Sequence, residues 1–86
     1  MAGIDWEAVA RAETHTLRLR IIEYAAADPE RDFAAVDLAN EWGFPVPNVA
    51  HHLRELHQGQ FLERARDRRT GGSPARCFRA SGKLLR

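Results

Sequence analysis

Basic and amide side chains in the C-terminal half are the groups of this chain best suited to recognising another molecule. Residues 45–86 hold nine basic and three acidic residues, whereas residues 1–44 hold four basic and nine acidic ones. The net charge is only +1, but this asymmetry predicts that one side of the protein faces a polyanion. Arginines are dense after residue 60, at Arg64, Arg66, Arg68, Arg69 and Arg76. A guanidinium group can donate paired hydrogen bonds to a phosphate or to the edge of a guanine.

Catalytic and metal-binding chemistry is not predicted from the other side chains. No serine, cysteine or carboxylate stands beside a partner base in a recognisable catalytic arrangement, so we do not expect an enzyme. Neither a metal nor another cofactor is expected, because His51, His52 and His57 lack the four-residue spacing of a helical metal-binding pair. The single cysteine, Cys77, excludes an internal disulfide and a cysteine-clustered zinc site. We interpret Cys77 as a small core-facing residue, with a redox-sensing thiol as the alternative.

The element that must position the basic residue Arg54 is a helix-turn-helix, predicted over residues 34–58. In its first helix, Leu38 and Trp42 lie four residues apart on one face. Gly43 follows, and glycine suits the left-handed position that ends a helix. Two short helices joined by a glycine-containing turn are typical of this motif.

The second helix of the motif is predicted from Pro47 to about Gln58. Val46 precedes a proline and is expected outside the helix, whereas Pro47 suits its first position. His52 flanks the apolar stripe of this helix and is interpreted as a scaffold residue. Because Val46 offers no capping oxygen, the N–H groups of Asn48 and the next residue are expected to be free for an anion. The stripe itself consists of Val49, Leu53 and Leu56.

The face opposite this stripe carries the candidate contact residues of the helix. We expect it to enter the major groove of B-DNA, where each base pair displays a distinct pattern of donors and acceptors. Arg54 suits guanine or phosphate, and the amides of Asn48 and Gln58 match adenine. His51 can donate to a phosphate or a purine, and Ala50 can lie against a thymine methyl. With 100° per residue, the face and its flanks hold Pro47, Asn48, Ala50, His51, Arg54 and Gln58.

An arginine-rich hairpin, or wing, is predicted at about residues 61–80, before a short basic tail at residues 81–86. Its turn would lie at Thr70–Pro74, where the sequence Thr-Gly-Gly-Ser-Pro is typical of turns. Three of its arginines alternate and would share one face of a strand. We expect the wing to bind the DNA backbone or the minor groove and to supply most of the affinity. The wing residues concerned are Arg64, Arg66, Arg68, Arg69 and Arg76.

Two further helices are predicted before the helix-turn-helix. The first runs from about residue 5 to residue 12 or 13 and has an apolar face made of Trp6, Val9 and Ala10. This face would either pack on the domain or form the seam of a homodimer. The second runs from Thr14, as its cap, to about Ala27. Residues 33–36 are either a short strand or the start of the next helix.

The 86 residues are therefore predicted to form one domain, mainly α-helical with a small antiparallel β-hairpin. Four helices precede a two-stranded wing, and a third short strand near Phe33–Ala35 is an option. No apolar run approaches the roughly 18–20 residues that span a bilayer, so no membrane partner is expected. The acidic N-terminus lacks the features of a secretory signal, and the cytoplasm is the expected compartment.

Several features between about Leu17 and Ala80 can be compared with a known family. They are the opening Asp37-Leu38-Ala39, the glycine turn, the run His51-His52-Leu53-x-x-Leu56, and Phe61-Leu62 leading into a basic wing. Together they resemble the ArsR-type (arsenic-repressor-like) winged helix-turn-helix transcriptional regulators. The resemblance implies a repressor that binds double-stranded DNA with its second motif helix and its wing.

The chain departs from this family at three places. Metal-sensing members carry Cys-x-Cys at the start of the third helix, where this chain has Ala34 and Val36, so that metal site is not expected. Many members end in a helix that helps them dimerise, and the six residues after Ala80 are too few for it. The start of the DNA-reading helix, often rich in serine and threonine, is Pro45-Val46-Pro47. This last departure favours the alternative function, a winged-helix protein-interaction module that docks an acidic partner on its basic wing.

Overall fold

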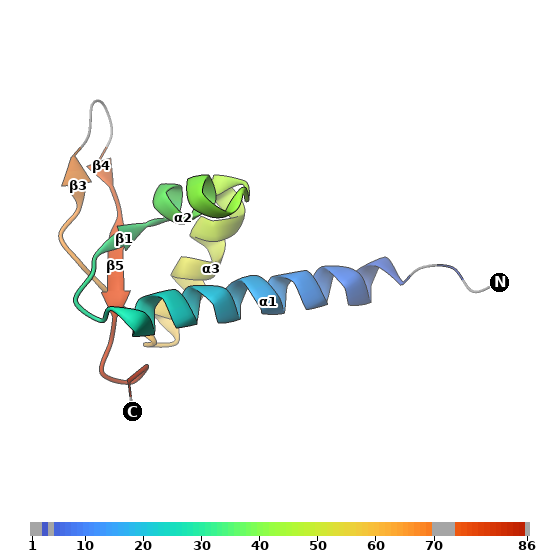
Figure 1. The fold of residues 1–86 in the computed structure, drawn as a ribbon, viewed down its shortest axis with the longest axis horizontal. Helices are drawn as coiled ribbons and strands as arrows, with labels where there is room; N and C mark the ends of the chain where they lie inside the picture. Colours follow the sequence, from blue (N-terminus) through green and yellow to red (C-terminus); the bar gives the residue numbers. More distant parts are fainter. Residues whose placement is uncertain (1–2, 4, 70–73, 86) are drawn as a thin grey trace.

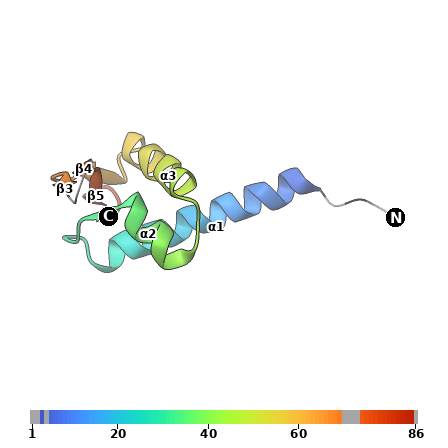
Figure 2. The same ribbon diagram turned by 90° about the horizontal axis from the view of Figure 1, so that it is seen from above.

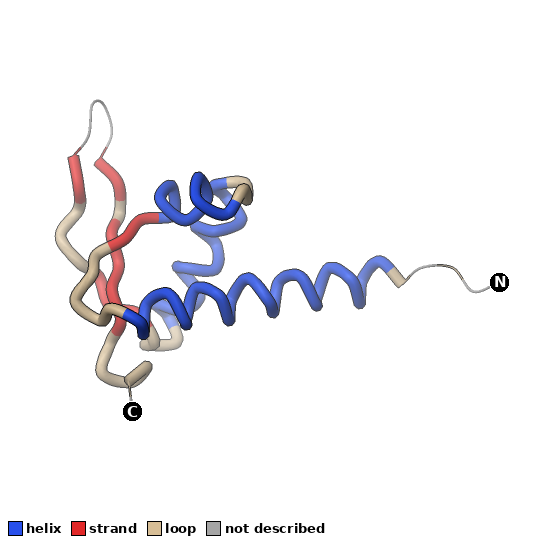
Figure 3. The backbone as a smooth tube through the Cα atoms, in the orientation of Figure 1, coloured by secondary structure: helices blue, strands red, loops and turns tan. Residues whose placement is uncertain are grey.

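Three helices and five short strands are present among residues 3, 5–69 and 74–85, which the computed structural model describes; of residues 6–14 only the backbone is described. The strands gather at the C-terminal end of the first helix, and the second and third helices lie beside them (Figure 1). Figure 3 shows the same separation of helices from strands. The elements are α1 (Trp6–Ala27), β1 (Phe33–Ala34), α2 (Ala35–Trp42), α3 (Val46–Gln58), β2 (Leu62–Arg64), β3 (Arg68–Arg69), β4 (Pro74–Ala75) and β5 (Cys77–Ala80).

The first helix corrects the sequence prediction, because α1 is one continuous helix of 22 residues where two helices were expected. Thr14 does not cap a new helix but lies inside α1. Between Trp6 and Ala27 there is no glycine or proline, and the many alanine, arginine, leucine and glutamate residues favour an unbroken helix. Four predicted helices therefore become three. In both Figure 1 and Figure 2, the N-terminal part of α1 extends beyond the other elements.

Strand β5 is the centre of a three-stranded antiparallel sheet in the order β1-β5-β2. It pairs with β1 through Phe78 opposite Phe33, and with β2 through Ala80 opposite Leu62. Strands β3 and β4 form a second ladder further along the same hairpin. Both options for residues 33–36 are thus realised, because a short strand leads directly into α2. Residues 70–73 of the predicted turn lie outside the described residues.

The turn of the helix-turn-helix begins at Gly43, which adopts the left-handed conformation with φ 76°. Its N–H donates to the carbonyl oxygen of Ala39 at 2.9 Å, and the N–H of Phe44 donates to the same oxygen at 3.2 Å. These two bonds end α2 as the sequence predicted. Figure 2 shows α2 and α3 side by side after the turn.

Helix α3 begins at Val46, one residue earlier than predicted, with Pro45 in extended conformation as its N-cap. Pro47 at the second position is tolerated, because the first four N–H groups of a helix have no acceptor within it. The prediction of free N–H groups at this end is wrong for two residues. The N–H groups of Asn48 and Val49 donate to the carbonyl oxygen of Pro45 at 3.1 and 3.4 Å.

The hydrophobic core lies where α1, α2, α3 and the sheet meet. The predicted stripe of α3 is confirmed, because Val49, Leu53 and Leu56 are buried. His52 beside the stripe is buried as well, as expected for a scaffold residue. The other elements contribute Leu17, Ile21, Ala25, Phe33, Leu38, Ala39, Leu62, Phe78 and Ala80 to the same cluster.

Replacing Gly43 by alanine should lower the free energy of unfolding by about 1 kcal/mol, because a Cβ is disfavoured in the left-handed region. No described atom lies within 4 Å of the position that an added Cβ would take, so the backbone alone causes the loss. The matched control is Gly82→Ala, which also adds a Cβ into open space but at a position without positive φ. Urea denaturation measures the free energy of unfolding of both variants. Equal losses in the two would contradict the conclusion that the left-handed backbone of Gly43 causes the effect.

Candidate nucleic-acid interface

The outward face of α3 consists mainly of the side chains that the sequence placed there. Of the six predicted contact residues, Ala50 alone is half-buried, because it borders a hollow between α3 and the wing. The helix is therefore amphipathic, with its polar face turned away from the core. The five exposed residues are Pro47, Asn48, His51, Arg54 and Gln58.

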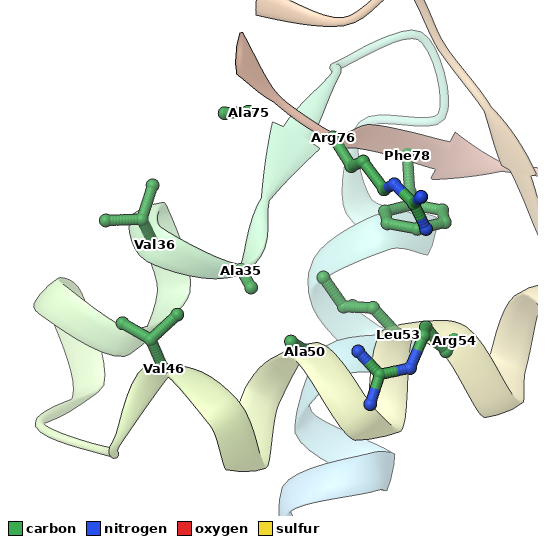
Figure 4. Close-up of a pocket in the computed structure, with 9 residues that line it drawn as sticks. All are labelled: Ala35, Val36, Val46, Ala50, Leu53, Arg54, Ala75, Arg76 and Phe78. Carbon is green, nitrogen blue, oxygen red and sulfur yellow. The ribbon is translucent and has the colours of Figure 1, made fainter. Parts of the chain in front are cut away.

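A hollow of about 230 Å³ lies between α3, the start of α2 and the wing. Figure 4 shows Arg54 of α3 and Arg76, which lies between β4 and β5, at the end of the hollow near Phe78. The other end is bordered by Val36 and Val46, which are 40% and 42% exposed. The helix and the wing therefore present one arginine each to the same concave surface.

The alternating arginines of the wing do not share one face of a strand, contrary to the prediction. The strand is interrupted, since β2 ends at Arg64 and β3 begins at Arg68. The guanidinium of Arg64 lies 5.5 Å from the ring centroid of Phe78, whereas that of Arg68 lies 3.7 Å from Sγ of Cys77. Consecutive residues of a strand point to opposite faces. The two arginines therefore lie on opposite faces of the hairpin.

Two predicted wing contacts are paired within the protein. Arg64 forms an ion pair with Asp67, and Arg68 donates hydrogen bonds to both carboxylate oxygens of Asp37. These side chains remain between 33% and 45% exposed. Ion pairs at such positions contribute only about 0–1 kcal/mol. A phosphate can therefore replace either carboxylate at small cost.

Asp37 joins the wing to the start of α2, a role that the sequence analysis missed. Its Oδ2 accepts a hydrogen bond from the N–H of Ala34 at 2.9 Å in addition to the bond from Arg68. The hydrogen bond from Arg68 is the main cause that lowers the pKa of Asp37, and it also raises the pKa of Arg68. The only feature of the sequence that could have indicated this role is that Asp37 is an acidic residue in the first turn of a helix. Its partner lies 31 residues further along the chain.

The side chains of four predicted contact arginines are exposed and make no hydrogen bond or ion pair to the part of the chain that the structure describes. One lies on α3 and three on the wing, so both elements present uncommitted positive charge. Guanidinium groups in this state can bind an anion without first breaking an internal pair. They are Arg54, Arg66, Arg69 and Arg76.

Arg18 connects α1 to α3 and was not predicted as a functional residue. Its Nη2 donates to Glu55 at 2.7 Å and lies 3.3 Å from Nδ1 of His52. Glu55 also pairs with Nε2 of His51 at 3.1 Å. These contacts fix the polar edge of α3 against α1. No short-range spacing reveals them, because Arg18 and Glu55 are 37 residues apart.

Within the described residues, no group of three or more histidine, cysteine or acidic side chains is arranged to hold a metal ion. Among those residues there is also no helix with the length and apolarity needed to cross a membrane. The Cys77 thiol is free and 2% exposed, so it is buried as expected, but it lies against Arg68 and outside the main core cluster.

The chain shares its fold with a solved protein structure. No protein-family model matches the chain, and no curated protein sequence matches it. A solved structure described as a "possible transcriptional regulator" from Methanosarcina mazei Go1 is similar, with a TM-score of 0.69 over 93% of this chain and 68% of that chain. The two sequences are 18% identical, so the likeness shows a shared fold. Three helices with a small antiparallel sheet are compatible with a winged helix.

The free energy of unfolding should fall as the pH drops below 6.5, the ordinary pKa of histidine. Burial is the main cause that lowers the pKa of His52 in the folded protein; Arg18 and His51 add to it, and Glu55 opposes it. Below pH 6.5 the unfolded chain takes up a proton that the folded protein excludes, until the lowered pKa is reached.

Urea titrations at a series of pH values measure this effect. Replacing His52 by glutamine should flatten the pH dependence, whereas His15→Gln, at an exposed position on α1, should leave it nearly unchanged. The assignment fails if the His52 variant keeps the slope of the wild type.

Proposed function

We propose that the protein is a transcriptional regulator that binds double-stranded DNA sequence-specifically. One observation carries the proposal: Arg54 of α3 and Arg76 of the wing border the same concave surface. A single duplex can therefore touch both elements. The concentration of basic residues in residues 45–86, which supply most of this surface, supports the same conclusion.

In the proposed complex, α3 enters the major groove with its exposed face. Arg54 binds a guanine edge or a phosphate, and Asn48 lies near the start of the helix, where recognition helices meet base edges. His51 can donate to a phosphate after releasing Glu55, its partner at 3.1 Å. Gln58 is at the far end of α3 and completes the predicted amide contacts. A well-formed bidentate base contact contributes roughly 1–3 kcal/mol of discrimination.

The wing supplies contacts that are independent of sequence. Arg66, Arg69 and Arg76 bind phosphates directly, because their guanidinium groups have no hydrogen-bond or ion-pair partner among the described residues. Arg64 and Arg68 bind phosphates after exchanging their internal carboxylate partners. Each phosphate that is neutralised releases counterions, so the affinity should depend steeply on salt.

Within this class, we propose an ArsR-type repressor that does not sense metal at the family's cysteine site. The resemblance in the residues of α2, the glycine turn and α3 supports this assignment. The positions of the Cys-x-Cys motif are Ala34 in β1 and Val36 in α2, and neither side chain can bind a metal ion. We therefore propose that regulation depends on another signal.

Arg54→Ala and Arg66→Ala should affect DNA binding in different ways. Loss of Arg54 should relax the sequence preference by about 1–3 kcal/mol at one base position. Loss of Arg66 should weaken all sequences alike and reduce the slope of log K against log salt by about 1. Selection from a random duplex pool, followed by titrations at about 50 and 200 mM salt, measures both effects. Arg79→Ala is the matched control, because Arg79 in β5 is neither a predicted DNA contact nor a lining residue of the hollow.

The same titrations address the alternative, a module that docks an acidic protein. Two exposed valines at the concave surface, Val36 and Val46, favour this reading, because they would suit an apolar protein partner better than a phosphate backbone. Salt-sensitive binding to random duplex DNA supports the regulator. If no binding occurs even at about 50 mM salt, the DNA-binding proposal is wrong.

We propose further that two copies associate through the N-terminal part of α1. The backbone there extends beyond the rest of the fold, and it carries Trp6, Val9 and Ala10, whose side chains lie outside the described part (Figure 1). A twofold dimer would read a palindrome with half-sites about one helical turn apart, near 34–36 Å.

Val9→Glu should abolish this dimer, because it places a charge in an apolar seam. Sedimentation equilibrium should give a dimer mass for the wild type and a monomer mass for the variant. The control Ala26→Glu adds the same charge at an exposed position near the other end of α1 and should remain dimeric. A wild type that stays monomeric at all concentrations would contradict the proposal.

A further inference from the structure

The hollow between α3 and the wing has two chemically different ends. At one end, Arg54 and Arg76 border it without a hydrogen-bond or ion-pair partner among the described residues (Figure 4). At the other end, Val36 and Val46 leave about two fifths of their surface exposed. Ala50 lies on α3 between the apolar end and the arginine end. A cationic end joined to an apolar end matches a ligand with an anionic group on an apolar body.

The floor of the hollow is part of the protein core, so its shape is fixed by packing. Leu53 and Phe78 line it and are 1% and 4% exposed. The backbone of Phe78 is fixed in the sheet, where it pairs with Phe33 across the β1–β5 ladder. A ligand would therefore meet a preformed apolar surface, which is typical of small-molecule sites.

The size of the hollow limits the occupant. Its volume of about 230 Å³ is below the roughly 300–1,000 Å³ of sites for drug-sized ligands. A single thymine methyl would leave most of it empty. One aromatic ring with a carboxylate fits better, because the ring can cover the apolar end while the carboxylate lies toward the arginine end. Paired hydrogen bonds to a carboxylate are the contacts that guanidinium geometry favours.

We propose that this hollow is an effector site for a small aromatic carboxylate. The regulatory consequence rests on the proposed function, since Arg54 and Arg76 are also proposed DNA contacts. A carboxylate bound between them offsets one of their two positive charges, occupies their hydrogen-bond donors and fills the space beside α3. Ligand and DNA therefore compete, and the ligand releases the protein from its operator.

The first experiment tests the ligand without DNA. Benzoate is titrated into the full chain at constant ionic strength and followed by amide chemical shifts. Two matched probes accompany it: benzamide has the ring without the charge, and acetate has the charge without the ring. Benzoate should saturate and shift amides around the hollow, including Ala35, Val46 and Ala75. Its affinity should exceed that of either matched probe at least about tenfold, which corresponds to 1.4 kcal/mol.

Two variants tie this binding to the hollow. Ala75→Leu adds volume from the wing, at a lining residue outside the predicted DNA contacts, and should abolish saturation. Arg76→Gln should weaken benzoate about tenfold. Its matched control, Arg79→Gln, removes the same charge from an arginine paired with Glu63 and should change the affinity less than about twofold.

The second experiment measures competition. With benzoate at ten times its own dissociation constant, the apparent dissociation constant for DNA should rise about tenfold. Acetate at the same concentration should leave it unchanged.

Three results would overturn the inference: no saturation at tens of millimolar benzoate, equal shifts with acetate, or binding that survives in Ala75→Leu. If DNA protects the hollow but benzoate does not bind it, the hollow is part of the DNA contact and the effector site is wrong. If benzoate binds and the chain does not bind DNA, the proposed function fails while the ligand site stands.

Discussion

The burial of one apolar stripe on α3 determines most of what this surface can do. Val49, Leu53 and Leu56 pack against α1, α2 and the sheet, so the rotation of α3 about its own axis is fixed. The outward residues then follow from helical geometry alone. Arg18 reinforces this orientation from α1 through Glu55. Without the stripe, the arginine of α3 and the arginines of the wing would have no defined relation.

The parts of the fold that sequence reasoning predicted are those governed by local rules. The stripe of α3 has helical periodicity, and Gly43 marks the end of α2 because few other residues accept a left-handed backbone. The continuous α1 was missed because Thr14 resembles a cap, although its neighbours favour helix on both sides. The one-residue shift at the start of α3 has a similar origin, since rules for prolines describe preferences that a first helical turn can override.

The parts that could not be predicted depend on contacts between distant segments. The pair Asp37–Arg68 joins α2 to the wing across 31 residues, and periodicity carries no information at that range. The hollow is still less accessible to sequence analysis, because it forms only where α2, α3 and the wing converge. Alanine and valine at its border look like ordinary helix residues until their exposure is known. The sequence indicated cations but not the apolar surface beside them.

The hydroxyl-free start of α3 changes how binding is distributed over the surface. Pro45, Val46 and Pro47 offer no side-chain donor to a phosphate, and the first N–H groups of α3 already bind Pro45. Electrostatic contacts must then come from the arginines. In the proposed complex, this would shift the balance of affinity from the helix start towards the wing, and it leaves an apolar surface at the start of α3.

The carboxylates of Asp37 and Asp67 have a consequence beyond holding the hairpin in place. Each acts as a resident counterion for one arginine, so a solitary anion arriving from solution gains little by displacing it. A closely spaced row of phosphates gains more, because several exchanges occur together and reinforce one another. In the proposed complex, Arg64 and Arg68 would therefore discriminate by charge density: they would favour a polymer of phosphates over a dilute small ion.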